Sequence, residues 1–77
     1  MKNKDVVRSW FRGDEASSTN MHTDGKDLFS YQLLIGSFVE GEAVIMDYTK
    51  ENSVSHTTSR HVNLAATVTG ASRVKPN

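Results

Sequence analysis

Residues 20–31 read NMHTDGKDLFSY, and this stretch decides the fold of the 77-residue chain. Asp24-Gly25 is a dipeptide that favours a tight turn with positive φ, and the residues on both sides of it suit strands. We therefore expect a β-hairpin with strands at 20–23 and 28–31. A hairpin alone is marginal in water, so further strands or a packed helix must complete the fold.

The second strand of the hairpin is expected to continue to Val39, with Gly36 as a bulge or a point of close approach. A turn at 40–42 then leads into a strand at 43–48. A short fourth strand is expected at the sheet edge over 53–57. The pattern predicts a small antiparallel sheet of three to four strands.

A helix over residues 4–12 precedes the sheet, because Val7, Trp10 and Phe11 recur at i, i+3 and i+4. Asn3 can cap this helix and Gly13 can end it. Nine residues are too few for an independent helix, so the aromatic side is expected to pack on the sheet, with Trp10 at the centre of the core. The polar residues 14–20 are expected to form a loop.

A second helix is expected over 59–69, with Gly70 ending it. Thr57 and Thr58 are expected to cap its first turn. His61 is interpreted as a structural histidine whose ring packs against Tyr31 or Tyr48, or faces solvent.

The predicted fold is a single α+β domain over residues 1–69, with an N-terminal and a C-terminal helix packed on the sheet. Residues 70–77 have nothing to bury and are expected to form a disordered, flexible tail.

Composition restricts the class of protein. Seventy-seven residues with 36% hydrophobic content suit one modest core. There is no cysteine for disulfides, and the charged start lacks the apolar stretch of a signal peptide. No run approaches the length of a membrane span. We expect a soluble, cytoplasmic monomer that does not contact a membrane.

The net charge is zero, but the charges are segregated along the chain. Residues 14–51 hold eight acids against two lysines, a formal −6, and the two ends hold seven bases against Asp5, a formal +6. This separation could give a dipolar surface that steers a charged partner. The alternative is that the segments fold together and their charges compensate.

Several short strings resemble one known family: Trp10, the run 17–20, Leu28-Phe29-Ser30-Tyr31 with Ile35-Gly36, and Ser55-His56-Thr57-Thr58-Ser59-Arg60-His61. Together they resemble a short uncharacterised domain of bacteriophages and prophages, over roughly residues 6–68. Val54 and Gly36 depart from its usual Tyr and Ala. The resemblance implies a phage origin and a compact αβ fold, with no established catalytic activity.

Catalytic and metal-binding patterns are weak. His22, His56 and His61 lack the spacing and the cysteines of a zinc site. Ser55 and Ser59 near these histidines lack a nucleophile elbow, and the single glycines form no phosphate-binding loop. We expect no enzyme activity, no cofactor and no metal.

Binding is the favoured function. We expect a basic partner-binding set made of Lys4, Arg8, Arg12, Arg60, Arg73 and Lys75. The first hypothesis is a phage-type protein that binds a host protein complex, RNA polymerase being the specific expectation, as a transcription inhibitor or antiterminator. The second hypothesis is a nucleic-acid-binding module that uses the same N-terminal helix. The edge strand at 53–57, and Trp10 or Tyr31 if exposed, could also contact a protein partner.

Overall fold

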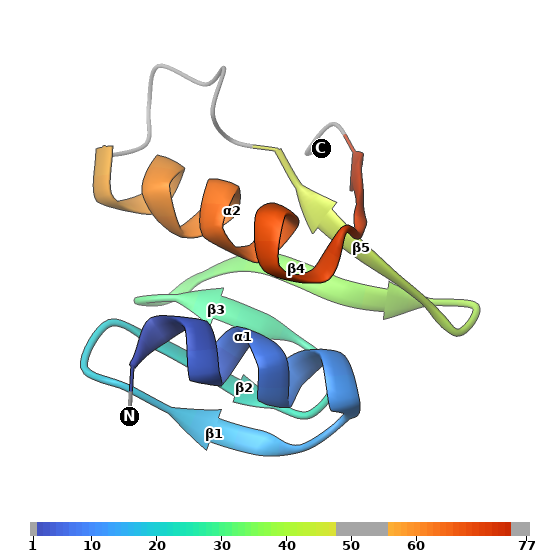
Figure 1. Ribbon diagram of the computed structural model, residues 1–77, viewed down its shortest axis with the longest axis horizontal. Helices are drawn as coiled ribbons and strands as arrows, with labels where there is room; N and C mark the ends of the chain where they lie inside the picture. Colours follow the sequence, from blue (N-terminus) through green and yellow to red (C-terminus); the bar gives the residue numbers. More distant parts are fainter. Residues whose placement is uncertain (1, 48–55, 75–77) are drawn as a thin grey trace.

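The computed structural model describes residues 2–47 and 56–74, which form two helices and one six-stranded sheet. The two helices lie side by side on one face of the sheet (Figure 1). The elements in chain order are α1 (Asn3–Arg12), β1 (Glu15–Ser17), β2 (Met21–Asp24), β3 (Leu28–Ser30), β4 (Leu33–Val39), β5 (Glu42–Met46), α2 (His56–Thr69) and β6 (Ser72–Val74). The strands lie in sequence order across the sheet; each pairs antiparallel with the next, except that β6 runs parallel to β5.

The predicted hairpin is confirmed as β2 and β3, whose residues Thr23 and Leu28 are register partners. Gly25 has φ +97° at the turn. The Asp24 carboxylate accepts the backbone N–H groups of Lys26 at 2.9 Å and Asp27 at 2.8 Å. These bonds, that of Asp27 first, lower the pKa of Asp24 below its ordinary value. The turn is therefore held by its own short-range contacts, as its sequence indicates.

The continuous strand predicted from residue 28 to Val39 is wrong, because the chain reverses at Tyr31 and forms the separate strands β3 and β4. Tyr31 has φ +56°, which lies in the left-handed region. The close approach predicted at Gly36 is confirmed: a Cβ there would lie 3.0 Å from Trp10 Cζ2. The β3–β4 register also shifts between Leu28 and Phe29. Glycine thus lets the indole ring lie directly on the sheet.

The sheet is larger than the predicted three to four strands. The expected loop at 14–20 contains β1, which pairs with β2. The expected disordered tail contains β6, which pairs with β5 although all three of its residues are exposed. Backbone hydrogen bonds hold this strand where apolar burial is lacking. Of the predicted edge strand at 53–57, residues 53–55 lie outside the described residues, and the next two belong to α2.

Helix α1 begins one residue earlier than expected, so Asn3 lies inside the helix and Lys2 is the capping position. The Asp5 carboxylate accepts the backbone N–H of Lys2 at 3.4 Å. Gly13 ends the helix in the left-handed conformation, as predicted, and its N–H donates to Trp10 O at 3.0 Å. Both ends of α1 are therefore closed by local contacts.

Helix α2 begins at His56, three residues earlier than expected. Thr57 and Thr58 therefore lie within its first turn and not before it, so the predicted capping position for them is wrong; the preceding residue lies outside the described part. Gly70, with φ +67°, follows the helix as expected, and its N–H donates to Ala66 O at 2.9 Å. Among the described residues, no helix is long and apolar enough to cross a membrane.

The core lies between the helices and the inner face of the sheet. On β2, Met21 and Thr23 are buried while His22 and Asp24 are exposed, as expected for a sheet covered on one side. Trp10 is fully buried, as predicted, and its Nε1 donates to Lys26 O at 2.7 Å. The buried apolar residues are Val6, Val7, Trp10, Met21, Leu28, Ile35, Ile45, Val62 and Ala65.

Candidate binding surface

Three of the predicted binding residues project from α1 into solvent. Lys4, Arg8 and Arg12 are spaced at i, i+4 and i+8 and are all exposed, whereas the buried side of the same helix packs on the sheet. The structure therefore brings these three cations together on one helix side.

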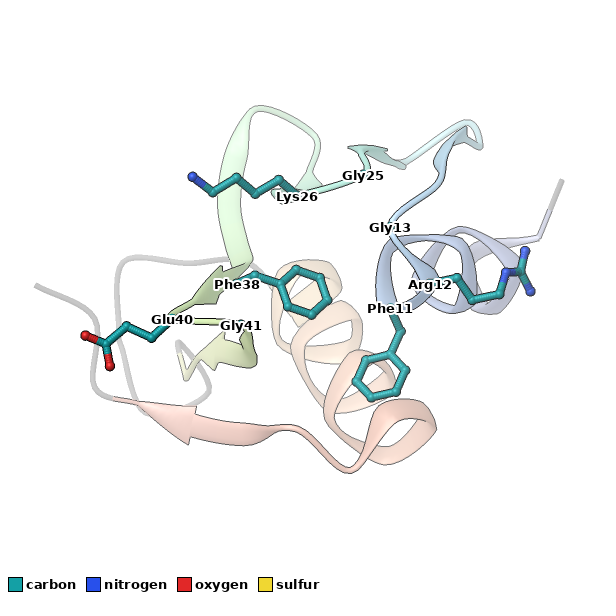
Figure 2. Close-up of a pocket in the computed structure, with 8 residues that line it drawn as sticks. All are labelled: Phe11, Arg12, Gly13, Gly25, Lys26, Phe38, Glu40 and Gly41. Atoms are coloured by element: carbon teal, nitrogen blue, oxygen red, sulfur yellow. The ribbon is translucent and has the colours of Figure 1, made fainter.

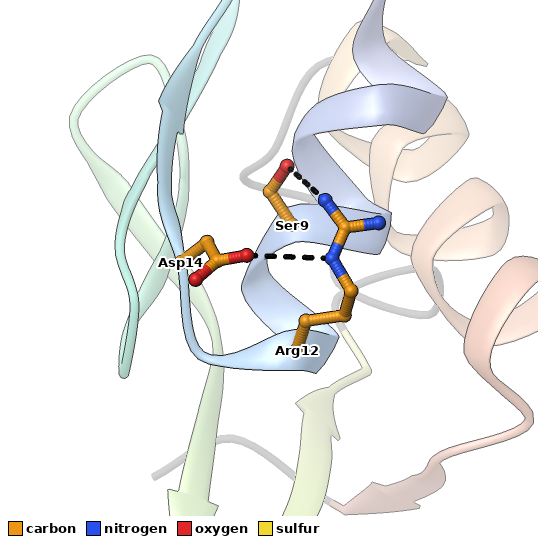
Figure 3. Close-up of polar contacts among 3 residues, drawn as sticks. All are labelled: Ser9, Arg12 and Asp14. Carbon is orange, nitrogen blue, oxygen red and sulfur yellow. Dashed lines mark hydrogen bonds and ion pairs between the residues drawn. The ribbon is translucent and has the colours of Figure 1, made fainter.

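Arg12 is partly engaged within the protein (Figure 3). Its Nε lies 3.4 Å from Asp14 Oδ2, and its Nη2 donates to Ser9 Oγ at 3.4 Å. Both ion-pair side chains are 64% exposed, so the pair contributes at most about 1 kcal/mol and water screens it. A partner carboxylate or phosphate could replace Asp14 at little cost.

Lys4 and Arg8 form no ion pair within residues 2–47 and 56–74. The Asp5 carboxylate, three residues before Arg8, accepts the backbone N–H of Lys2 at the start of the helix. Neither cation has an anion within ion-pair distance in the described part of the chain.

Arg60 lies on α2, at the end of the helix pair where α1 begins. Asn3 Nδ2 lies 3.3 Å from His61 Nε2, which places the neighbours Lys4 and Arg60 at the same end of the helix pair. Arg60 is exposed. We name the surface formed by Lys4, Arg8, Arg12 and Arg60 the basic helix face.

Arg73 does not belong to this face. Its Nη1 donates to Asn63 Oδ1 at 3.0 Å and lies 3.7 Å from Asp47 Oδ1, where β6 meets α2 and β5. In Figure 1, α2 separates β6 from α1. Lys75 lies outside the described residues. Of the predicted basic set, Arg73 therefore contacts residues of the protein itself, and the position of Lys75 is not described.

Several exposed acidic side chains lie on the strands. Glu15 and Asp24 are exposed register partners on β1 and β2, and Glu42 is exposed at the start of β5. Arg12–Asp14 and Arg73–Asp47 are the ion pairs found between described residues. The charge segregation along the chain thus persists in three dimensions to a large extent.

His61 is buried in a polar network. Its Nδ1 lies 2.5 Å from Ser30 Oγ, and Asn3, which contacts Nε2, accepts a hydrogen bond from Ser18 Oγ at 2.6 Å. The Tyr31 ring lies 5.9 Å from the His61 ring, which confirms one of the expected packing partners; Tyr48 lies outside the described residues. Burial lowers the pKa of His61 below its ordinary value of 6.5.

This network joins α1, α2 and β3 and is shielded from solvent at Ser30 and His61. Ser30 and His61 are 1% and 4% exposed, although their side chains are close enough to resemble a nucleophile and its base. The described residues contain no group of three His, Asp or Glu side chains arranged to hold a metal ion. Tyr31 is 49% exposed and remains available as a contact residue.

Sequence reasoning missed the exposed aromatic residue Phe11. It was expected in the core with Trp10, but it is 47% exposed. Its ring lies 6.5 Å from that of Phe38 on β4, beside Lys26. The only sequence signal was that Phe11 stands at the margin of the apolar stripe of α1, next to the basic row.

No protein-family model, curated protein or solved structure matches this chain.

Proposed function

We propose that this chain is a small binding protein that contacts an acidic surface of a macromolecular partner through its basic helix face. The observation that carries the proposal is the exposure of Lys4 and Arg8 on one helix side, without ion-pair partners in the described part of the chain. Exposed cations with no internal anion remain free to pair with a partner's acids, and their shared orientation favours one docking face.

The partner proposed first is a host protein complex, and within that class bacterial RNA polymerase, whose transcription the chain would inhibit or antiterminate. This choice rests on the sequence resemblance to a phage and prophage domain, over Leu28-Phe29-Ser30-Tyr31 and the string from Ser55 to His61. A protein surface is favoured over a nucleic acid because the acids of β1 and β2 would repel a duplex that reached beyond the helices.

The test is an affinity capture from nuclease-treated bacterial lysate, with the bound proteins identified by mass spectrometry. We expect the wild-type chain to retain a defined complex, and the variant Lys4→Glu with Arg8→Glu to lose it. A charge-preserving control, Lys4→Arg with Arg8→Lys, should bind as the wild type does. Circular dichroism of each variant checks that α1 still folds.

Retention of the same complex by the Glu variant would show that the basic helix face is not the docking surface. Loss of every bound protein after nuclease treatment, with steeply salt-dependent retention of nucleic acid, would favour the second hypothesis of a nucleic-acid-binding module.

A further inference from the structure

A hollow of about 580 Å³ opens at the C-terminal end of α1, between that helix and the strand β4. This volume falls within the range of small-ligand pockets, roughly 300–1,000 Å³. Figure 2 shows the rings of Phe11 and Phe38 at its centre, one from each element. The hollow adjoins the basic helix face, because Arg12 belongs to both.

The aromatic wall of the hollow is held in place by the core. Phe38 packs on the buried Trp10 ring with centroids 5.3 Å apart, and Phe11 lies 6.4 Å from the same ring. Phe11 and Phe38 are themselves 6.5 Å apart and tilted by 32°. The two phenylalanine rings therefore present a pre-organised apolar surface, with nearly half of Phe11 exposed to water.

Gly13, Gly25 and Gly41 line the hollow. Gly13 and Gly25 pass so close that a Cβ on Gly25 would lie 2.7 Å from Gly13 O, so no side chain can project from this crossing. On the other side, a Cβ at Gly41 would meet nothing within 4 Å. Within residues 2–47 and 56–74, no side chain from these glycine positions fills the space beside the two rings.

The rim of the hollow is mainly cationic. Arg12 and Lys26 extend outward on opposite sides of it, and Glu40 is the acid among the lining residues (Figure 2). Asp14 lies outside the lining and forms the exposed ion pair with Arg12. Beyond Arg12, the positive surface continues along α1 to Arg8. A group that enters the hollow is therefore favoured if it carries negative charge next to its apolar part.

We infer that the hollow between Phe11 and Phe38 receives an aromatic side chain from an acidic segment of the protein partner. The inference rests on the proposed function and specifies the chemistry of that partner. The incoming ring would pack on the two phenylalanines, and the acids beside it would face Arg12 and Lys26. In protein interfaces, a few buried residues, often aromatic, commonly contribute most of the binding free energy.

The direct test uses two small probes that share a phenyl ring and differ in charge: phenylpropionate, an anion, and phenethylamine, a cation. Isotope-labelled protein is titrated with each probe, and the amide resonances of Gly13, Gly25 and Gly41 are followed by NMR. We expect saturable shifts with phenylpropionate, with a dissociation constant on the order of 1 mM, as is usual for so small a ligand. Phenethylamine should bind at least several-fold more weakly.

Phe11→Ala should abolish these shifts, and its own spectrum shows whether the fold is kept. Val39→Ala is the matched control, because Val39 is also an exposed apolar residue, at 54%, but does not line the hollow. Absence of saturable shifts, or unchanged binding to Phe11→Ala, would overturn the inference. Equal affinity for the two probes would refute the acidic character of the occupant.

Failure of this inference is distinguishable from failure of the proposed function. If the lysate capture loses its complex with the Lys4 and Arg8 reversals but keeps it with Phe11→Ala, the proposed function stands and the aromatic anchor does not. If the wild-type chain captures no protein, the proposed function fails, and negative probe titrations would then remove the hollow as a binding site as well.

Discussion

His61 joins three elements through its two ring nitrogens. Asn3 on α1 accepts from Ser18 through its Oδ1, so its Nδ2 donates to His61 Nε2. This assignment places the imidazole proton on Nδ1, which donates to Ser30 Oγ on β3. A charged imidazolium would carry a second N–H at Nε2, facing the amide hydrogens of Asn3. The network therefore fits only the neutral ring.

The stability of the protein should fall in mildly acidic solution because of His61. Burial lowers its pKa in the folded state, so the unfolded chain binds the proton more readily. The contribution of His61 to the free energy of unfolding is complete above its ordinary pKa of 6.5, and it is lost as the pH falls through the lower folded pKa. Urea unfolding at a series of pH values measures this slope.

His61→Gln should flatten the slope, while lowering stability at neutral pH by about 1–3 kcal/mol through the loss of buried hydrogen bonds. His22→Gln is the control, because His22 lies exposed on the outer face of β2. An unchanged slope in His61→Gln would contradict the assignment.

At the scale of elements, β6 shows how a polar strand is held in a sheet. Asp47 N donates to Val74 O at 2.8 Å, and Arg73 reaches both Asn63 on α2 and the Asp47 carboxylate after β5. The Arg73 side chain thus links the strand to α2 and to Asp47, and the backbone hydrogen bond from Asp47 links it to the sheet. The strand depends on these contacts because none of its three residues belongs to the buried core.

Arg73→Ala should therefore loosen β6 without unfolding the core. We expect the Asp47 amide to exchange with solvent several-fold faster, and global stability to fall by about 0.5–1 kcal/mol. Hydrogen exchange followed by NMR measures the first effect and urea unfolding the second. Arg60→Ala, which removes an exposed arginine of α2, should change neither; unchanged exchange at Asp47 in Arg73→Ala would show that the backbone alone holds the strand.

At the scale of the whole molecule, the two layers carry opposite charge. Cations are concentrated on the helices at Lys4, Arg8 and Arg60, and the acids Glu15 and Asp24 lie on the strands. In a neutral chain this arrangement gives an electric dipole across the molecule. A dipole of this kind orients the protein before contact and affects the association rate more than the lifetime of the complex.

The association rate with the captured complex should fall at least about tenfold between roughly 0.05 M and 0.5 M NaCl, because screening shortens the reach of the helix cations. Surface-based kinetic measurements test this. Arg73→Ala should keep the salt dependence, because that arginine already lies beside Asp47. A rate independent of salt would contradict electrostatic steering.

Local sequence signals predicted the elements whose stabilising contacts are short in range. The turn at Asp24-Gly25 is stabilised by hydrogen bonds from the backbone to the Asp24 carboxylate, which span at most three residues. Gly13 ends α1 through its left-handed conformation and a hydrogen bond to Trp10 O, three residues back. The same logic failed at Tyr31, because a positive φ at tyrosine has no local signature and is imposed by the pairing of the strands around it.

The candidate site was predicted in part for a related reason. Helical spacing alone places Lys4, Arg8 and Arg12 on one side of α1, so that row could be read from the sequence. Three features of the site depend on which elements become neighbours in the fold. Arg60 lies at the same end of the helix pair as Lys4, Arg73 pairs with Asp47, and Phe11 is exposed. Periodicity carries no information about those neighbours.

The sequence by itself therefore determined the α+β class, the first helix with its basic side, and the hairpin β2–β3. Each follows from contacts within a few residues. Only the tertiary structure decided that β1 and β6 join the sheet, that His61 bridges to Asn3 and Ser30, and that a hollow opens beside Phe38. These features arise from backbone pairing and burial between segments that are distant in the chain. A local sequence pattern cannot predict such long-range contacts.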